Sequence, residues 1–213
     1  MRHWRGLLLL ALYVALFAGG ALIGRWLLDI FALDVRPSNE SQVHAMIMAS
    51  TAAYIVTSVI PFVPAAEIGL GLMIMLGPSI CFLVYLSTIV ALALAYLIGR
   101  LVPARATAAM FAFFGLKRAE ELMLQMEPLD ADERLKLLTA RAPRRSVPFL
   151  LRHRYLTLAL AFNLPGNTLL GGGGGIGLAA GMSGLYPVAT YLIIVAIAVA
   201  PVPLIVLLSG KLW

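Results

Sequence analysis

The sequence predicts an all-α polytopic membrane protein with two opposed re-entrant helical hairpins, about three full transmembrane helices and a cytoplasmic helical segment. Three observations predict this class. Of the 213 residues, 62% are hydrophobic and the mean hydropathy is +0.95, as in integral membrane proteins. Glu67 is the only charged residue between Glu40 and Arg100. Proline and glycine interrupt one apolar segment in each half of the chain, a pattern typical of transporter binding sites.

Length and charge favour a single membrane domain over residues 1–213. The net charge is +6, and eleven of the sixteen Lys and Arg residues lie between positions 100 and 154. This clustering fits the positive-inside rule better than nucleic-acid binding, so we expect no nucleic-acid partner. Cys81 is the only cysteine, so no intrachain disulfide can form.

The first expected element is a transmembrane helix over residues 7–28. Its apolar run is long for the hydrophobic region of a signal peptide, so we interpret it as an uncleaved helix. The preceding Arg2 and Arg5 predict a cytoplasmic N-terminus, and the polar loop that follows the helix is then expected outside.

Residues 43–77 form the first interrupted segment. Proline removes a donor and clashes with the preceding turn, so the helix is expected to end at Pro61. After Pro64, residues 65–77 cover only about 20 Å at ~1.5 Å per residue, against about 30 Å of hydrocarbon. A single crossing, residues 79–98, then has to connect the outer loop with the basic cytoplasmic region. Residues 43–77 are therefore expected to enter and leave on the outer side as a re-entrant hairpin.

Residues 101–154 are expected to form the cytoplasmic amphipathic helical segment. The stretch Lys117 to Met126 has the period of an amphipathic helix, and Asp130 with Glu133 predicts a capping box. The basic end of this segment predicts a topology determinant that contacts anionic lipid headgroups.

By the same reasoning, residues 155–184 form a second re-entrant hairpin, which enters from the cytoplasm. Residues 187–209 form the last transmembrane helix, interrupted by Pro201 and Pro203, and place the C-terminus outside. In each half a proline, two further residues and a polar residue precede small residues, and a second proline then starts a long span. This faint repeat predicts inverted topology.

Glu67, which follows Pro64 in the first interruption, is the leading candidate for a coupling group. A charge at membrane depth is costly, so such residues usually face the protein interior or a water-filled cavity. A carboxyl in that setting can bind and release a proton near neutral pH. The structural alternative is a protonated Glu67 hydrogen-bonded to carbonyls that the broken helix leaves free.

The second interruption offers Asn163 and Asn167, which we expect to face Glu67. A helix that starts after Pro165 and Gly166 would point free N–H groups at an anionic head group. Alternatively, both amides only satisfy the broken backbone, and the sequence favours neither interpretation.

Arg100 and Arg154 flank membrane elements and are candidates to contact a lipid phosphate, or they serve as ordinary interfacial anchors. The five glycines from Gly171 to Gly175 indicate close helix approach, with flexibility for gating as the alternative. The sequence has no nucleophile–base set and no metal-ligand spacing, so we expect no enzyme, no catalytic residue, no metal and no cofactor.

Several short motifs resemble the DedA superfamily, also called the VTT or SNARE-associated Golgi protein family, over roughly residues 45–210. They are Pro61-Phe62-Val63-Pro64-Ala65-Ala66-Glu67, Gly99-Arg100, Leu164-Pro165-Gly166, Ala180-Gly181-Met182 and the closing Ala200-Pro201-Val202-Pro203. The first hairpin also resembles the related small multidrug export proteins. The resemblance implies opposed hairpins and lipid transport, with undecaprenyl phosphate or a phospholipid as substrate in bacterial members. It also implies proton coupling through acidic residues and phosphate contact through arginines.

Glu67 matches the first-hairpin acid of the family, whereas Asn167 stands where the family often has an arginine. We therefore expect a transporter of a bacterial inner membrane that moves a lipid or lipid-linked phosphate between leaflets. Proton coupling through Glu67 belongs to this expectation, and self-association into a homo-oligomer is left open. The alternatives are a small-molecule or multidrug exporter, and a non-transporting scaffold recruited through residues 101–154.

Overall fold

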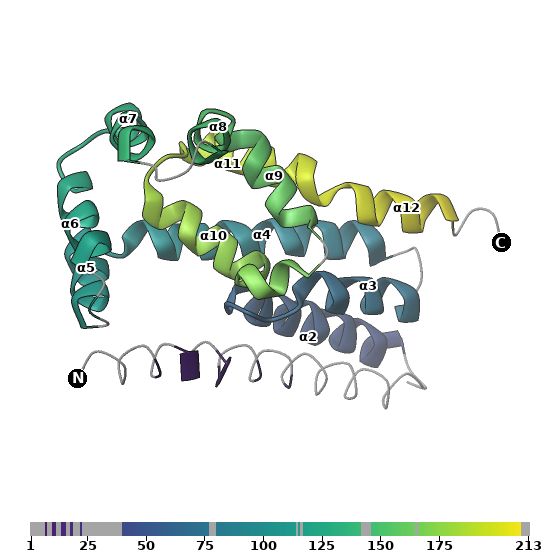
Figure 1. The fold of residues 1–213 in the computed structure, drawn as a ribbon. Helices are drawn as coiled ribbons and strands as arrows, with labels where there is room; N and C mark the ends of the chain where they lie inside the picture. Colours follow the sequence, from purple (N-terminus) through teal and green to yellow (C-terminus); the bar gives the residue numbers. More distant parts are fainter. Residues whose placement is uncertain are drawn as a thin grey trace.

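The computed structural model describes residues 40–76, 80–113, 115, 117–141, 146–164 and 166–209, together with isolated positions between 7 and 22. Most of the expected first transmembrane helix, residues 7–28, lies outside the described residues, as does Pro165. Within the described part of the chain, helices are the only regular structure (Figure 1), which confirms the all-α class.

The first half contains a pair of adjacent helices followed by a long helix: α2 (Glu40–Val59), α3 (Ala65–Leu76) and α4 (Cys81–Leu101). The α2–α3 turn is tight, with Ile60 N donating to Thr57 O at 3.1 Å and Ala65 N donating to Val63 O at 2.9 Å. Because the prolines at 61 and 64 cannot donate, the chain reverses here and α3 runs back beside α2 (Figure 1).

Short helices follow α4, and α5 and α6 lie at its C-terminal end (Figure 1): α5 (Ala104–Phe113), α6 (Lys117–Met126), α7 (Ala131–Arg141) and α8 (Ser146–Arg152). The bounds of α6 confirm the amphipathic helix expected from the sequence. The capping box of α7 is also confirmed. Asp130 Oδ1 accepts from the Glu133 backbone N–H at 2.8 Å, and Glu133 Oε2 accepts from the Asp130 N–H at 3.1 Å.

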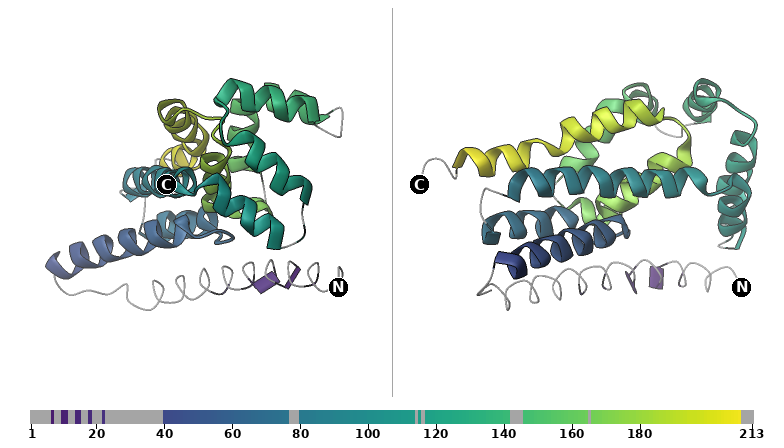
Figure 2. Two further views of the ribbon diagram at one scale, coloured as in Figure 1. Left: turned by 90° about the vertical axis from the view of Figure 1, so that its left-hand side faces the viewer. Right: turned by 180° about the vertical axis from the view of Figure 1, so that it is seen from behind.

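The second half repeats the helix–interruption–helix pattern: α9 (Arg154–Asn163), the 3₁₀ turn η2 (Asn167–Leu170) and α10 (Gly172–Ser183), then α11 (Val188–Val199) and α12 (Pro201–Ser209). The open end of the α2–α3 pair lies where α4 begins. The open end of the α9–α10 pair lies toward the opposite end of α4, as Figures 1 and 2 show. The two pairs therefore point their turns toward each other.

Small residues allow α4 and α10 to pack backbone against backbone. A Cβ at Gly181 would meet the Tyr96 carbonyl oxygen, and a Cβ at Gly99 would meet the Leu178 carbonyl oxygen. Gly99 and Gly181 thus allow close helix approach, the ordinary role of glycine in membrane helices.

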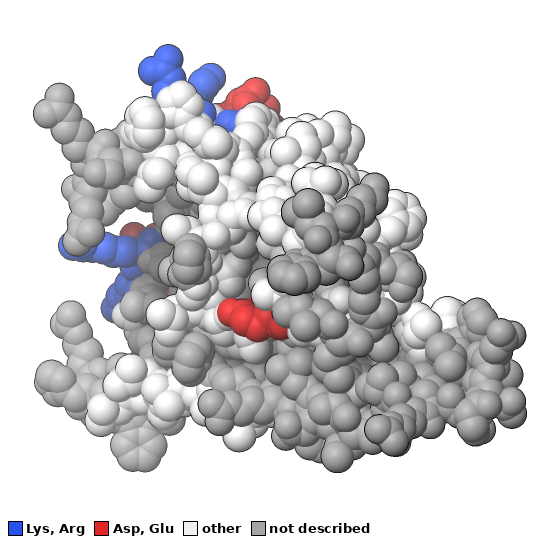
Figure 3. All heavy atoms as spheres, turned by 90° about the vertical axis from the view of Figure 1, so that its right-hand side faces the viewer, with Lys and Arg blue, Asp and Glu red and all other residues white. Residues whose placement is uncertain are grey.

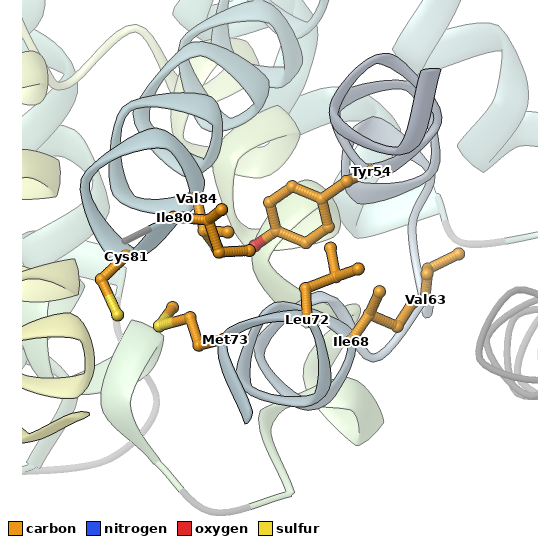
Figure 4. Close-up of a cluster of buried hydrophobic side chains, with 8 residues drawn as sticks. All are labelled: Tyr54, Val63, Ile68, Leu72, Met73, Ile80, Cys81 and Val84. Atoms are coloured by element: carbon orange, nitrogen blue, oxygen red, sulfur yellow. The ribbon is translucent and has the colours of Figure 1, made fainter. Parts of the chain in front are cut away.

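The buried side chains form two clusters that share α4. The first joins α2, α3 and α4, and Figure 4 shows Tyr54 projecting from α2 between side chains of α3 and α4. The second joins α4 to α9, α10 and α11 and contains the stacked rings of Tyr96 and Tyr191, with centroids 4.1 Å apart. Val206 and Leu207 of α12 pack against the first cluster, so the α11–α12 segment crosses from one cluster to the other.

Two segments, Cys81–Leu101 and Val188–Ser209, are long and apolar enough to span a membrane. Only 39% and 17% of their most apolar windows are buried inside the protein. Large apolar side chains of both segments are exposed, among them Phe82, Leu101, Ile193, Ile197 and Ile205.

Candidate functional site

The two interrupted segments meet directly. The Phe62 backbone N–H donates to the Gly171 carbonyl oxygen at 2.7 Å. A Cβ at Gly172 would lie 2.8 Å from Val63 O, and a Cβ at Gly174 would lie 2.5 Å from Val59 O. Because these distances leave no room for a side chain, the glycines let the start of α10 rest on the α2–α3 turn.

The backbone on both sides of this contact is left-handed. Phe62 has φ +68°, whereas Gly171 and Gly172 have φ +110° and +66°. A left-handed conformation strains a non-glycine residue by about 1–2 kcal/mol and persists only where the surroundings hold it. The hydrogen bond to Gly171 supplies part of that restraint on Phe62.

A small cavity of about 80 Å³ lies between the two halves, lined by Tyr54, Ala66, Gly69, Met73, Thr88, Phe162, Asn163, Ala198, Val199, Val202 and Pro203. Its buried polar pair is Tyr54 Oη and Thr88 Oγ1, 2.8 Å apart. Thr88 Oγ1 already donates its proton to Val84 O at 2.7 Å, so Tyr54 is the donor in this pair. The cavity therefore has a hydroxyl pair in a lining of mostly apolar side chains.

Asn163 and Asn167 both bond backbone carbonyls, as the structural alternative predicts. Asn163 Nδ2 donates to Ala159 O at 2.9 Å and to Ala198 O at 2.8 Å. Asn167 Nδ2 donates to Phe162 O at 2.9 Å and is buried. Because both amide hydrogens of Asn163 are committed, its carbonyl oxygen is the group left for a ligand.

Glu67 is exposed, in the first turn of α3. The sequence predicted an interior or cavity-facing carboxylate opposite the asparagines. In the structure, α3 buries the face that carries Ile68 and Leu72, and the helical period turns Glu67 away from it. Its neighbour Ala66 lines the small cavity, whereas Glu67 does not.

The position of Glu67 still suits a carboxylate, because the first turn of a helix carries partial positive charge. Figure 3 shows an acidic group on one face of the molecule, with uncharged atoms of described residues beside it.

The turn residues of the two interruptions serve backbone geometry. The Pro64 carbonyl accepts the Ile68 N–H at 3.1 Å and so starts α3. Gly166 has φ +74°, and a Cβ there would have no atom within 4 Å. Glycine is therefore needed at this position for the left-handed backbone conformation, and not to make room for a neighbouring atom.

Arg100 and Arg154 lie on either side of Tyr186. Arg100 Nη1 donates to Tyr96 Oη at 2.9 Å and to the Tyr186 carbonyl oxygen at 3.3 Å. The Tyr186 hydroxyl donates to the Arg154 carbonyl oxygen at 3.3 Å. Burial raises the pKa of the Tyr186 phenol, and the nearby Arg154 guanidinium partly offsets that rise.

The Arg154 guanidinium is mostly buried, with 13% of its side chain exposed. Its Nη2 donates to Tyr155 Oη at 3.1 Å and lies 3.8 Å from Asp132 Oδ1. Among the described residues, Arg154 Nε is buried and has no hydrogen-bond partner. Such a donor is unusual in a folded protein and marks a place where an acceptor is missing.

Sequence reasoning missed Arg134, which donates to three carbonyls: Leu129 O at 2.9 Å, Ser183 O at 3.3 Å and Glu127 O at 3.5 Å. It lines a cavity of about 460 Å³ where the C-terminal ends of α4, α6 and α10 converge, and Arg100 lines it too. Helix C-termini are partly negative, so both cations neutralise this junction. The signal in the sequence was Gly184, a glycine of the kind that ends a helix in the left-handed conformation. In the structure it caps α10, and a Cβ there would meet Arg134 Nη1.

The described residues define a helical protein with two helical segments long and apolar enough to span a membrane, in which two interrupted helix pairs meet. No family model, curated protein or solved structure matches this chain. The resemblance to the DedA superfamily therefore stays a prediction from the sequence motifs.

Proposed function

We propose that this chain is a DedA-like integral membrane transporter that moves a lipid or lipid-linked phosphate between leaflets. The meeting of the two interrupted helix pairs at Phe62 and Gly171, together with a cavity between the two halves that has polar groups, is the observation that carries the proposal. Interrupted helices from two halves that meet at a shared site are typical of secondary transporters.

The exposed apolar surface supports insertion in a membrane. Only 17% of the apolar window of Val188–Ser209 is buried, whereas the core helix of a soluble protein would be mostly buried. Large contiguous apolar surface in contact with water is rare in soluble monomers. A bilayer around α4, α11 and α12 removes that surface from water without a protein partner.

In the proposed topology both helix pairs are re-entrant hairpins, and the short helices α5 to α8 are cytoplasmic. The positive-inside rule supports this orientation, because residues 100–154 carry most of the basic side chains. The end of α12 then faces the outside of a bacterial inner membrane, and residues 7–28 are the remaining transmembrane helix.

Arg154 is the first candidate to contact a lipid phosphate, because its buried Nε has no partner among the described residues. Arg100 is the second candidate, and it uses Nη1 to hold Tyr96 Oη and the Tyr186 carbonyl oxygen. A phosphate oxygen can accept from Nε and a terminal nitrogen together, as a bidentate pair. In this proposal the exposed Glu67 binds and releases the coupling proton.

Lipid flipping by the purified chain in reconstituted vesicles tests the function. Wild-type protein is expected to flip a fluorescent phospholipid or undecaprenyl phosphate, and Arg154→Gln is expected to lower the rate about tenfold, as for loss of a charged hydrogen bond. Arg152→Gln, an exposed neighbour of the same charge, serves as the control and should flip at the wild-type rate.

Proton coupling is tested separately with a pH gradient across the same vesicles. Glu67→Gln should abolish the response of the rate to the gradient, whereas Glu121→Gln, an exposed acid in α6, should keep it. Folded wild-type protein that flips neither lipid contradicts the transporter proposal and favours a scaffold. Flipping that ignores both the gradient and Glu67→Gln contradicts only the coupling role.

A further inference from the structure

The last apolar span is broken in its middle. Helix α11 ends at Val199 and α12 begins at Pro201, with Ala200 between them. Prolines at 201 and 203 have no N–H, so the carbonyls four residues earlier lose their helical donors. Helical bonding resumes where Leu204 N donates to Ala200 O at 3.1 Å. Ala200 therefore lies where the span resists bending least.

Two side chains from other helices hold the last turn of α11. From α4, Tyr85 Oη donates to Ala196 O at 2.9 Å. From the end of α9, Asn163 Nδ2 donates to Ala198 O at 2.8 Å. Both contacts stop short of Ala200, and among the described hydrogen bonds no side chain of another helix bonds α12. The restraint on the span therefore ends where α12 starts.

Cavities flank the first turn of α12 on two sides. The larger, about 310 Å³, is lined by Cys81, Phe82, Tyr85, Ala200, Pro203, Leu204 and Leu207. The smaller is the polar cavity of about 80 Å³ that Asn163 lines, and Val202 and Pro203 form part of its wall. Pro203 belongs to both linings, so the first turn of α12 is the partition between the two spaces.

We propose that α12 is an arm that pivots at Ala200 and opens a passage between the two cavities, while Tyr85 and Asn163 anchor the last turn of α11 and confine the bend to Ala200. The empty space on both sides of Pro203 lets the arm move without displacing core side chains. Val206 and Leu207 rest on the first buried cluster and are only partly buried, so few apolar contacts oppose the motion. This inference does not depend on what the protein transports.

Cys81 is a native reporter of the pivot. It is the only cysteine, it is fully buried, and it lines the larger cavity against Leu204 and Leu207 of α12. The rate at which a small neutral reagent, methyl methanethiosulfonate, modifies Cys81 in the purified full chain should therefore follow the fraction of open molecules. Wild-type protein is expected to react slowly, and Cys81→Ser not at all.

Loss of either anchoring hydrogen bond should speed this reaction, because the bend can then extend into the last turn of α11. Asn163→Leu keeps the side-chain volume but removes the donor, and it should raise the rate about fivefold, the factor for one net hydrogen bond. Asn163 does not line the cavity that holds Cys81, so an increase must come through α12. Tyr85→Phe should give a similar increase, and the double variant about 25-fold if the two bonds act independently.

Two further variants decide the outcome. Pro201→Ala returns a donor to the carbonyl of residue 197 and should lower the rate below that of wild type. Tyr155→Phe, at the other end of α9, should leave it unchanged. Anchor variants (Asn163→Leu and Tyr85→Phe) that keep the wild-type melting temperature and the wild-type rate overturn the proposal. An equal increase in Tyr155→Phe overturns it too, and if the anchor variants do not fold, an unchanged or higher rate in Pro201→Ala does the same.

Discussion

The two interrupted segments solve the same problem by different means. The first, residues 60–64, uses two prolines and a left-handed phenylalanine, and its Phe62 N–H donates to the carbonyl of Gly171, outside its own helix pair. The second, residues 164–171, has left-handed glycines, and Asn167 Nδ2 donates to the free carbonyl of Phe162 within its own helix pair. The second segment thus satisfies its free carbonyl within its own helix pair, whereas the first depends on a hydrogen bond to the second. Substitutions in the second segment should therefore disturb both.

The largest effect is expected at the contact between the segments. Gly174→Ala places a methyl group 2.5 Å from Val59 O and 2.6 Å from Ser58 O, so backbone has to move. We expect a loss of about 3 kcal/mol in the free energy of unfolding in detergent micelles. Gly175→Ala is the matched control, since its methyl group meets only Pro61, at 3.5 Å. Equal losses in the two variants would contradict the close contact.

A smaller effect is expected within the second segment. Asn167→Ala leaves the buried Phe162 carbonyl without its 2.9 Å donor. The same unfolding measurement should show a loss of about 2 kcal/mol, the penalty for an unsatisfied buried acceptor. Gln125→Ala removes an exposed amide from α6 and should change the free energy by less than about 0.5 kcal/mol. An Asn167→Ala variant as stable as wild type would show that the segment does not need its amide.

On the side of the first hairpin, Gly69→Ala tests the polar pair of the small cavity. The added methyl group would lie 2.8 Å from Tyr54 Oη and would push it off Thr88. We expect a loss of about 1 kcal/mol, the net value of one hydrogen bond. In a Tyr54→Phe background the same substitution should lose less, because the hydroxyl is already gone. A double-mutant cycle without coupling would contradict this contact.

The smallest effect is expected at Glu67. Because the side chain is exposed, Glu67→Gln removes only its interaction with the start of α3, about 0.5 kcal/mol. Unfolding of the variant in micelles should therefore match wild type closely, even where the response of transport to a pH gradient is lost. A loss above about 2 kcal/mol would show instead that Glu67 holds the fold together.

Local features were predictable because they depend on neighbours in sequence. The prolines before Ala65 predicted the end of α2, and the hydrophobic period of residues 117–126 predicted α6. The spacing of Asp130 and Glu133 announced a capping box that both hydrogen bonds confirm. In each case the partners lie within one helical turn, so backbone geometry alone brings them together.

The candidate site was only partly predictable. The sequence identified both interruptions, but not that Asn163 bonds Ala198, or that Tyr54 pairs with Thr88. Arg134 was overlooked because its acceptors lie in the turn between α6 and α7 and at the end of α10, which converge only in the folded chain. Glu67 was expected inside because its surroundings in sequence are apolar, yet the face that α3 buries depends on where α2 and α4 lie.

By itself, the sequence determined an all-helical chain, two broken helix pairs and a glycine-rich helix, since proline, glycine and hydrophobic period act over a few residues. Only the tertiary structure decided that Phe62 bonds Gly171, that Glu67 lies at the surface and that α12 separates two cavities. The Phe62–Gly171 hydrogen bond, for example, joins residues 109 positions apart. Which of them form depends on how all the helices pack together, and no local pattern encodes that arrangement.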